Sequence, residues 1–497
     1  MTSIEVQSPA TGEVIAQVPD LGADEVRALV ERARQVQPGW ERLGFDGRAR
    51  LMLRAQKWLL DHRERVIETI VAETGKTYED AQIAEVAYGA HAFGFWAKQA
   101  PRYLADEKVS SAQLFVKGKK LLVRWRPLGV IGVIGPWNYP LTNSFGDCIP
   151  ALMAGNAVIL KPSEVTPLTS MLMAECLREC GFPEGVYQVA TGRGETGRAL
   201  VDLVDMVMFT GSTATGRKIA VQAAERLIPC ALELGGKDPM IVLRDADLER
   251  AANAAVYYSM QNSGQTCISI ERAYVEAPVY DEFVAKVTAK VAALRQGPGG
   301  VPGTADVGAM TFPPQLELIE EQLADAVAKG ATVIAGGHRR EGAGLFFEPT
   351  VLVDVDHTMD AMTQETFGPT LPIMKVADEE EAIRLANDSI YGLGGSVFTK
   401  DLDHGEAVAR RIHSGAVCVN DAMVNYTALE LPMGGAKQSG LGARHGAGGI
   451  RKFCEAQTIV VSRNFPKRDL HMFPNTAANT RRIGKLLQLL HGRGKRR

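Results

Sequence analysis

The hydrophobic and polar positions of residues 23–100 repeat with helical spacing. From Ala23 to Arg34 and from Arg48 to Leu60, apolar residues recur every three or four positions between charged ones. Because one turn of an α-helix takes about 3.6 residues, this spacing places the apolar side chains on one face of each helix. The sequence therefore predicts a helical layer with a solvated outer face, and no residue of this region stands out as a candidate for chemistry.

The pattern changes at Leu121, where short apolar runs bounded by turn residues begin. Such runs are typical of buried β-strands. The predicted strands are Leu121–Val123, Val130–Ile134, Ala157–Leu160, Val186–Ala190, Met206–Phe209, Ile268–Val275, Thr332–Ala335, Leu371–Val376 and Gln457–Ser462. Helical stretches such as 168–180 and 316–329 lie between them. Strands that alternate with helices predict parallel sheets covered by helices, so the expected fold class is α/β.

Several of these strands end in polar or glycine residues. Asn138, Lys161, Gly211 and Ser212 each fall just after a strand. In open parallel sheets, ligands bind beyond the carboxyl ends of the strands, so we expect these residues to share one rim.

A glycine motif in the same region resembles a dinucleotide-binding fingerprint but lacks its usual context. Residues 192–197 match the GxGxxG pattern between a strand and a helix. The usual dinucleotide fingerprint lies on the first strand and has an acidic residue roughly 20 positions further on. Here the next strand ends in Thr210 and Gly211 instead. Chance or loop geometry is the better explanation of this match.

Length and charge bound the remaining choices. A chain of 497 residues exceeds what one hydrophobic core supports, so at least two domains are expected. The net charge of -3 gives no overall attraction to nucleic acid, and no nucleic-acid partner is expected. The charge is uneven, because residues 464–497 hold nine Lys or Arg and one Asp, a net of +8, which leaves -11 for the rest.

The cysteines indicate a reducing compartment. There are seven, an odd number, with no CxxC pair, which argues against a disulfide framework. Cys176 and Cys180 share a helical pattern without a nearby histidine, so core packing is favoured over a metal and no metal is expected. The N-terminus is polar and acidic, unlike a signal peptide, and no apolar run reaches the roughly 20 residues of a membrane span. We expect a cytoplasmic protein.

One cysteine lies in a different setting. Cys267 ends the polar, glycine-broken segment Gln261–Cys267, where backbone can approach a ligand closely and thiolate chemistry is feasible. A cysteine nucleophile needs a site for the developing negative charge and a base. Asn138 offers an amide donor, although a turn asparagine before Pro140 explains it equally well. Glu233, between two leucines and before paired glycines, is a candidate for a base with a raised pKa, although a solvent-facing strand glutamate is somewhat favoured when it is judged alone.

The rim residues suggest a nucleotide site. Lys161 can donate to ribose hydroxyls and Glu164 can accept from them, and a carboxylate there repels a 2'-phosphate. Gly211 and Ser212 precede a predicted helix, whose N-terminal amides favour a pyrophosphate. Taken singly, a solvated loop explains the first pair and a plain N-cap the second.

Taken together, these segments resemble the NAD(P)-dependent aldehyde dehydrogenase superfamily over nearly the whole chain, from Ser8 to Val460. The matching segments, in the order that the family shows, are Pro136–Pro140, Lys161–Glu164, Phe209–Thr213, Glu233–Lys237, Gly264–Cys267 and Glu365–Pro369. Met433 stands where the family usually has phenylalanine, an apolar exchange that leaves the mechanism unchanged.

The resemblance implies a role for each residue. Cys267 would attack the aldehyde, Asn138 and the Cys267 backbone N–H would hold the oxyanion, and Glu233 would activate the water that hydrolyses the thioester. NAD or NADP would be the cofactor. The residues that the resemblance assigns to its binding are Trp137, Asn138, Lys161, Glu164, Gly211, Ser212, Gly216, Leu234, Glu365 and Phe367.

The resemblance also implies a domain plan. A Rossmann-type cofactor domain would take residues 1–107 and 127–234, and an α/β catalytic domain residues 235–440. A β oligomerisation arm with its linking segment would take 108–126 and 441–463, which implies a homodimer or homotetramer. Residues 464–497 form a longer tail than the family usually has. Its apolar stripe Ile483, Leu486, Leu487 and Leu490 lies beside Arg481, Arg482 and Lys485, which suits peripheral membrane contact through 480–497 or docking on an acidic protein surface.

The substrate stays open between two classes. Overall similarity is greatest to bacterial succinate-semialdehyde dehydrogenases, which implies succinate semialdehyde. A carboxylate-bearing substrate favours an arginine near the nucleophile, yet residues 141–150 contain none and Arg272 suits packing. An apolar aliphatic or aromatic aldehyde is therefore the alternative. Two further alternatives are a catalytically silent binding protein and a CoA-dependent acyl transferase. The presence of Cys267, Glu233 and Asn138 argues against the first. The presence of Glu233 argues against the second.

Overall fold

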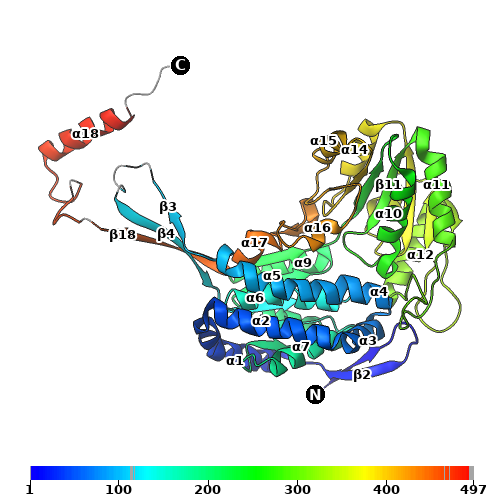
Figure 1. Cartoon of the computed structure of the whole chain (residues 1–497), viewed down its shortest axis with the longest axis horizontal. Helices are drawn as coiled ribbons and strands as arrows, with labels where there is room; N and C mark the ends of the chain where they lie inside the picture. Colours follow the sequence, from blue (N-terminus) through cyan, green and yellow to red (C-terminus); the bar gives the residue numbers. More distant parts are fainter. Residues whose placement is uncertain are drawn as a thin grey trace. The chain divides into compact units, whose positions relative to one another are not determined.

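The structure is a computed structural model of the chain, and it describes all residues except 1, 112, 114, 115, 117, 464, 470 and 492–497. It divides the chain into two compact units. The first unit comprises residues 1–104 and 127–455, and the second comprises residues 105–126 and 456–497. The first unit holds two large sheets, each covered by helices (Figure 1).

The first sheet has six strands and is parallel except at one edge. In spatial order they are β17 (Gly440–Leu441), β9 (Cys230–Glu233), β8 (Met206–Thr210), β5 (Val130–Ile134), β6 (Ala157–Lys161) and β7 (Tyr187–Val189). Ile134 pairs with Lys161 on one side and with Phe209 on the other, so the carboxyl ends of these strands meet at one edge. The predicted rim is therefore present.

Helices cover both faces of this sheet, and their patterns explain why. They are α1 (Ala23–Arg42), α2 (Gly44–Asp61), α3 (Arg63–Thr74), α5 (Tyr88–Tyr103), α6 (Cys148–Met153), α7 (Leu168–Glu179), α8 (Gly194–Val201) and α9 (Thr213–Glu225). The apolar stripe of α1, formed by Val26, Val30 and Ala33, packs with α8, α9 and the strands in one buried cluster. The predicted helices of residues 23–100 are confirmed. A small antiparallel hairpin, β1 (Ser3–Gln7) and β2 (Val14–Pro19), precedes them.

The second sheet has seven strands. Their spatial order is β12 (Thr332–Ala335), β13 (Thr350–Val353), β14 (Thr370–Val376), β11 (Ile270–Glu276), β10 (Asp238–Val242), β15 (Ser396–Phe398) and β16 (Cys418–Val419). Alternate residues of β10 point to opposite faces: Met240 and Val242 pack with α10 (Leu248–Met260) and α11 (Ala277–Ala292), while Ile241 packs with α12 (Pro313–Ala328) and α14 (Glu379–Asn387). A sheet covered on both faces reads as continuous apolar runs, as the sequence does.

The second unit contains a three-stranded sheet and a helix. The strand order is β18 (Cys454–Ser462), β4 (Lys119–Pro127) and β3 (Glu107–Val109). Helix α18 (Ala477–His491) follows in the tail. The last residues of the predicted tail, 492–497, lie outside the described part of the chain. No helix of the described residues is both long and apolar enough to cross a membrane.

Candidate active site

Cys267 follows a tight left-handed turn. The helix α10 ends at Met260, and Asn262, Ser263 and Gly264 then take φ angles of 50°, 55° and 70°. Gly264 is required here, because a Cβ at this position would lie 2.0 Å from the Gly368 carbonyl oxygen. The turn brings Cys267 back to the cleft with its side chain half-buried.

Asn138 lies against the same turn. Its side chain is buried, and Nδ2 donates a hydrogen bond to the Gln265 carbonyl oxygen at 2.9 Å. Gln265 is itself fixed, because its Oε1 accepts from Thr311 N at 2.7 Å and its Nε2 donates to the Asn262 oxygen at 2.9 Å. The hydrogen bond to Gln265 uses one of the two amide hydrogens of Asn138, which leaves the second for a ligand.

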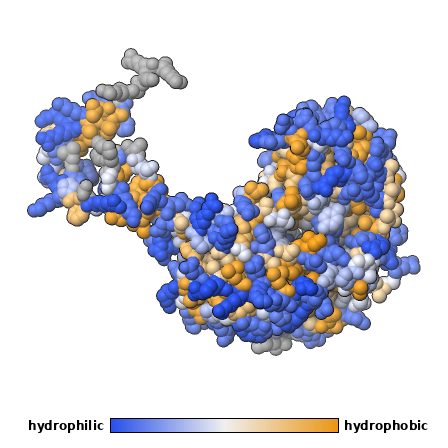
Figure 2. All heavy atoms as spheres, in the orientation of Figure 1, coloured by the Kyte–Doolittle hydropathy of each residue, from blue (hydrophilic) through white to orange (hydrophobic). Residues whose placement is uncertain are grey.

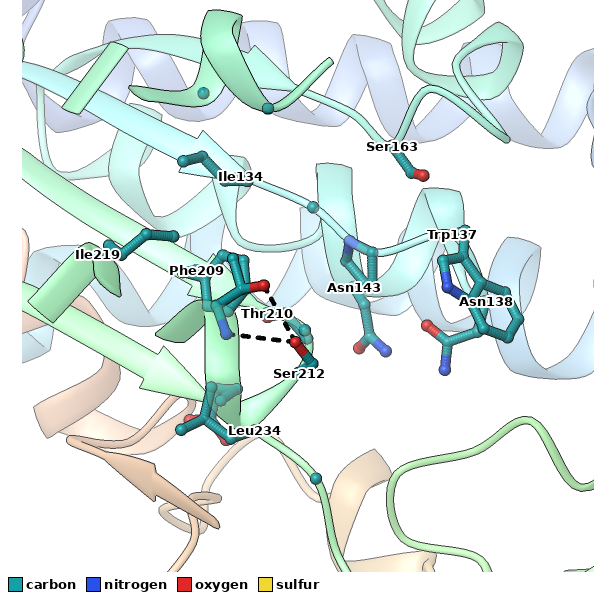
Figure 3. Close-up of a pocket in the computed structure, with 18 of the residues that line it drawn as sticks. Ile134, Trp137, Asn138, Asn143, Ser163, Phe209, Thr210, Ser212, Ile219 and Leu234 are labelled. Atoms are coloured by element: carbon teal, nitrogen blue, oxygen red, sulfur yellow. Dashed lines mark hydrogen bonds between the residues drawn. The ribbon is translucent and has the colours of Figure 1, made fainter. Parts of the chain in front are cut away.

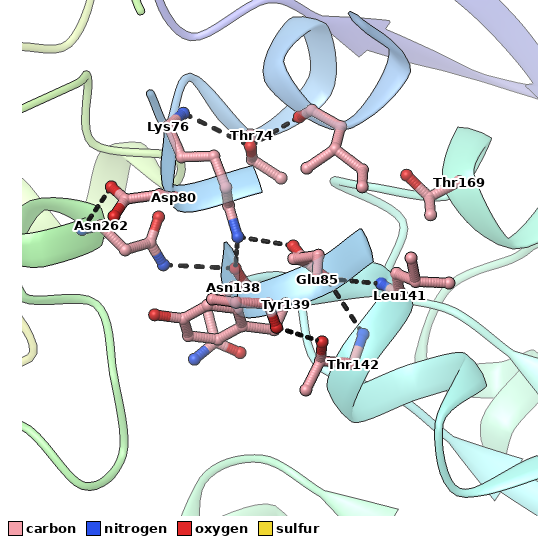
Figure 4. A network of polar contacts seen from close by, with 12 residues as sticks. Thr74, Lys76, Asp80, Glu85, Asn138, Tyr139, Leu141, Thr142, Thr169 and Asn262 are labelled. Carbon is pink, nitrogen blue, oxygen red and sulfur yellow. Dashed lines mark hydrogen bonds and ion pairs between the residues drawn. The ribbon is translucent and has the colours of Figure 1, made fainter. Parts of the chain in front are cut away.

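The loop of Asn138 is held by charged residues of the helical layer (Figure 4). Lys76 Nζ donates to Glu85 Oε1 at 2.6 Å and to the Asn138 carbonyl oxygen at 2.8 Å. Glu85 Oε2 accepts from the backbone N–H groups of Leu141 and Thr142 at 2.8 and 2.9 Å. Lys76 and Glu85 are fully buried and position the loop that carries Asn138, a role that the pattern of residues 23–100 did not indicate.

A second contact ties the Cys267 turn to the same layer. Asp80 Oδ2 accepts from Asn262 N at 2.9 Å, and the Tyr139 hydroxyl lies 2.8 Å from Thr266 Oγ1. Figure 4 shows Asp80, Asn262 and Asn138 side by side. The two loops that carry Asn138 and Cys267 are therefore held together by direct hydrogen bonds.

Glu233 ends strand β9 and is buried without a partner. Its side chain is 3% exposed, and neither carboxylate oxygen has a hydrogen-bond partner among the described residues. Burial raises its pKa to about 7, against the opposing charge of Arg444. The preference for a solvent-facing glutamate is wrong, because the residue is buried and its side chain lines the cavity at the end of β9.

Arg444 supplies a cation that the sequence did not reveal. Its guanidinium is buried and forms an ion pair with Asp147 at 2.9 Å. It also donates to Thr210 Oγ1, the Tyr426 hydroxyl and Asn143 Oδ1, at 2.7, 3.0 and 3.1 Å. Burial raises the pKa of the Cys267 thiol to about 12, and the charge of Arg444 opposes that shift. At neutral pH the resting thiol is therefore protonated.

All but one of the predicted site residues line one cavity of about 940 Å³ (Figure 3). The predicted residues that line the cavity are Trp137, Asn138, Lys161, Glu164, Gly211, Ser212, Glu233, Leu234, Cys267, Glu365 and Phe367. Gly216 does not line it. A Cβ on Gly216 would lie 2.5 Å from Leu234, so this glycine lets α9 pack against the cavity wall.

Lys161 and Glu164 form a pair at the rim. Lys161 Nζ lies 3.2 Å from Glu164 Oε2, and Glu164 is half-exposed while Lys161 is nearly buried. An amine beside a carboxylate offers donors and acceptors for a ribose diol. The exposed carboxylate is free to turn toward water.

The N-terminus of α9 opens into the cavity. Ser212 caps this helix, since its Oγ accepts from Thr215 N at 3.3 Å. Figure 3 shows this contact beside Phe209 and Leu234. The N-cap explanation is thus confirmed, and it is compatible with an anion at the helix terminus, because the first amides of a helix have no partner within it.

Glu365 and Phe367 enter from the second sheet's side. Glu365 Oε1 accepts from Gly236 N at 2.9 Å, and burial, reinforced by Glu271, raises its pKa to about 8. The Phe367 ring meets Trp137 edge-on at 5.4 Å. Both residues thus lie across the cleft from the rim of the first sheet.

The GxGxxG segment belongs to the cleft after all. Gly194 and Gly197, at the start of α8, line the cavity. No acidic residue follows at the end of β8 as in the usual fingerprint, so the segment lines the cavity without matching that fingerprint, and loop geometry is compatible with its place.

The chain belongs to the aldehyde dehydrogenase family, whose model matches residues 1–459. The predicted family and fold class are confirmed. The protein is an oxidoreductase that acts on aldehydes, with NAD or NADP as cofactor.

Three known proteins show how far the similarity reaches. A Mycolicibacterium smegmatis protein described as an NADP-dependent succinate-semialdehyde dehydrogenase is 42% identical over 463 residues, covering 92% of this chain and 88% of that protein. A 4,4'-diapolycopene aldehyde oxidase of a Methylomonas species is 37% identical over 495 residues, covering 99% and 92%. The crystal structure of a Mycobacterium tuberculosis aldehyde dehydrogenase with NAD+ is 36% identical, with a TM-score of 0.88 and coverage of 93% and 95%.

The cleft fits a nicotinamide dinucleotide. It combines amides at a helix N-terminus, an amine–carboxylate pair and a buried carboxylate around one cavity. A Cβ on Gly235 would lie 2.4 Å from Glu365 Oε2, so the wall carries no side chain there. This donor set suits pyrophosphate and ribose groups better than a metal or an apolar cofactor.

Proposed function

We propose that this chain oxidises aldehydes to carboxylic acids through covalent intermediates on Cys267. The observation that carries the proposal is that the Cys267 thiol, the Asn138 amide and the Glu233 carboxylate line the same cavity as the cofactor-type residues. A nucleophile, an oxyanion donor and a base in one desolvated site are the parts that acyl chemistry requires.

In the first step, the thiol loses its proton and attacks the carbonyl carbon. A thiol with a pKa of about 12 needs a base, and Glu233, with a pKa of about 7, is ionised in part at neutral pH. The new C–S bond forms a thiohemiacetal whose oxyanion accepts hydrogen bonds from the free Asn138 amide hydrogen and the Cys267 backbone N–H.

When bound, NAD(P)+ would supply the oxidant, as the acceptor of a hydride from the substrate carbon. Lys161 and Glu164 would hold the adenosine ribose, Gly211 and Ser212 the pyrophosphate, and Glu365 the nicotinamide ribose. The side chains of Trp137, Leu234 and Phe367 would pack against the bound cofactor, and Gly216 lies behind Leu234.

The last step releases the acid. The substrate is then a thioester on Cys267. Once Glu233 has released the thiol proton to solvent, it takes a proton from the water that attacks the thioester and returns a proton to the leaving thiolate. The carboxylic acid leaves and the thiol is restored. The unpartnered Glu233 carboxylate favours hydrolysis over transfer to CoA, and the intact set of three residues stands against a silent binding protein.

Succinate semialdehyde is the first substrate candidate. The Mycolicibacterium smegmatis relative carries that substrate in its name. Arg444 places a positive charge near Cys267, although Asp147 already balances it. Arg272 serves packing, as predicted, since it donates to the backbone oxygens of Lys237 and Ala386.

An apolar aldehyde is the second candidate, and two observations favour it. Ile268, Leu393 and Met433 form a buried apolar cluster against which Cys267 packs. The relative that matches 99% of this chain, including its tail, is named for an aldehyde of diapolycopene, a hydrocarbon.

We further propose a homodimer or homotetramer assembled through the strands β4 and β18, and a cytoplasmic location. An arm of paired strands offers an edge to another copy. The seven cysteines are all free, as a reducing compartment requires.

An aldehyde panel with NAD and NADP tests the reaction. Reduced cofactor should form with the wild type and be lost in Cys267→Ala, while Cys230→Ala, a half-buried thiol outside the cavity, should retain activity. Succinate semialdehyde and butanal have the same carbon count and differ in the carboxylate, so the ratio of their kcat/KM values separates the two substrate classes. No reduced cofactor with any aldehyde would refute the proposal, and turnover that requires CoA would replace hydrolysis.

A further inference from the structure

The tail helix α18 is amphipathic. Ile483, Leu486, Leu487 and Leu490 recur at helical spacing and share one face, and none of the helix's residues is buried within its unit. Leu487 and Leu490 are 44% and 42% exposed. Figure 2 shows apolar residues next to strongly polar ones on this segment. A helix with an uncovered apolar face requires a partner.

Charge identifies the kind of partner. Arg481, Arg482 and Lys485 lie on the polar side, and the helix contains no acidic residue that could pair with them. Each basic residue near an anionic lipid surface strengthens binding by a factor of about five. The sequence continues with Arg493, Lys495, Arg496 and Arg497 beyond the described residues.

Large apolar side chains also flank the helix. In the segment before α18, Phe465 and Phe473 are 79% and 83% exposed and Met472 is 45% exposed. Exposed aromatic and apolar side chains beside basic ones are typical of segments that lie in the membrane interface. Isolated exposed apolar residues are common on proteins, but here they share one short segment with the helix.

The tail lies outside the part of the chain that the aldehyde dehydrogenase family model matches. The family model ends at residue 459, and the succinate-semialdehyde relative matches 463 residues. The diapolycopene relative matches 495. The tail is thus kept in the relative whose name denotes a hydrocarbon-derived aldehyde.

We propose that α18 and the segment before it bind the surface of an anionic lipid membrane, with the apolar face inserted among the acyl chains and the basic residues at the headgroups. Binding is peripheral, since the helix is too short to cross a bilayer. Such docking would give the enzyme access to aldehydes dissolved in the membrane. This use rests on the apolar-aldehyde candidate above, whereas the docking itself does not.

Vesicle co-sedimentation tests the docking. The full chain should sediment with vesicles of phosphatidylcholine and phosphatidylglycerol, far less with phosphatidylcholine alone, and less at high salt. Deletion of residues 464–497 should abolish binding and leave the rate with butanal unchanged. Full-length protein that stays in the supernatant with anionic vesicles overturns the proposal, and a deletion that changes only the oligomeric state assigns the helix to a protein surface instead.

A matched pair of substitutions tests the apolar face. Leu490 lies on that face, whereas Leu489 lies among the basic residues at 66% exposure. Leu490→Glu should weaken binding to anionic vesicles about 10-fold more than Leu489→Glu, because both add the same charge and only the first removes an inserted leucine. Equal effects of the two overturn insertion. Absence of activity in the wild type and in every variant alike would instead count against the proposed reaction, which the docking does not need.

Discussion

Lys76 and Glu85 form a fully buried ion pair in which the lysine nitrogen also binds the carbonyl oxygen of Asn138. Glu85 holds the next part of the same loop through two backbone N–H groups. The place of the Asn138 amide therefore depends on two charges that have no contact with solvent. An amide that is preset in this way stabilises an oxyanion without reorganising during the reaction.

Lys76→Met should reduce both stability and kcat. Removing one partner of a buried pair leaves a buried charge, which costs about 3–5 kcal/mol. The double variant Lys76→Met/Glu85→Gln removes both charges and keeps an acceptor for the loop, so it should recover most of the stability. The kcat should stay low, because the Asn138 carbonyl then keeps only the longer hydrogen bond from Asn262 Nδ2, at 3.3 Å. Urea unfolding and steady-state kinetics measure the two effects, and full recovery of kcat in the double variant would limit the pair to a structural role.

Glu233→Gln should lower kcat by about 100- to 10,000-fold, the usual contribution of a general base. The wild-type kcat should rise with pH through about 7, since the carboxylate acts only when it is ionised. This rise should be absent in the variant. Glu225→Gln at the end of α9 removes the same charge away from the cavity and serves as the control. If the kcat of Glu233→Gln still rose with pH through about 7, this rise (the acidic limb of the pH profile) would belong to another group.

Arg444→Met should move that acidic limb to higher pH. The arginine charge opposes the rise in the pKa of Glu233, so its loss lets the pKa rise further. Arg444→Met/Asp147→Asn removes the paired carboxylate as well, and since Asp147 raises the same pKa, the limb should shift less in the double variant. If the acidic limb had the same midpoint pH in the wild type and in Arg444→Met, the charge of Arg444 would have no effect on the pKa of Glu233.

Glu164→Gln should shift the cofactor preference toward NADP. The carboxylate lies 3.2 Å from Lys161 and repels a 2'-phosphate when it faces the ribose. The expected change is about 10-fold in the ratio of kcat/KM values for NADP and NAD, as for one charge contact of about 1.4 kcal/mol. An unchanged ratio would mean that the half-exposed side chain already turns away when cofactor binds.

Local patterns revealed much of the fold and the cleft. Val130–Ile134 forms a strand with the predicted bounds, because a short run of β-branched residues between turns has few other stable states. The rim residues were predictable for the same reason, since parallel strands bring their carboxyl ends together.

The buried charges were not predictable, because their burial depends on partners far away in the chain. Arg444 and Asp147 are 297 positions apart, and Lys76 reaches Asn138 across 62. A charged residue in a single sequence gives no sign of such a partner, and solvent exposure is the ordinary expectation for it. The pKa of Glu233 depends on this same burial, so it too becomes visible only in the folded chain.

The short strand β17 also bears on how the chain folds during synthesis. Its two residues, Gly440 and Leu441, complete the edge of the first sheet beside β9, although more than two hundred positions of the second sheet's chain lie between them. Until the ribosome has delivered residue 440, the edge of β9 stays unpaired, and such an edge invites association with other chains. Two residues near the end of the first unit thus close the edge of the sheet that holds Glu233, and a nascent chain that stops before them is exposed to aggregation.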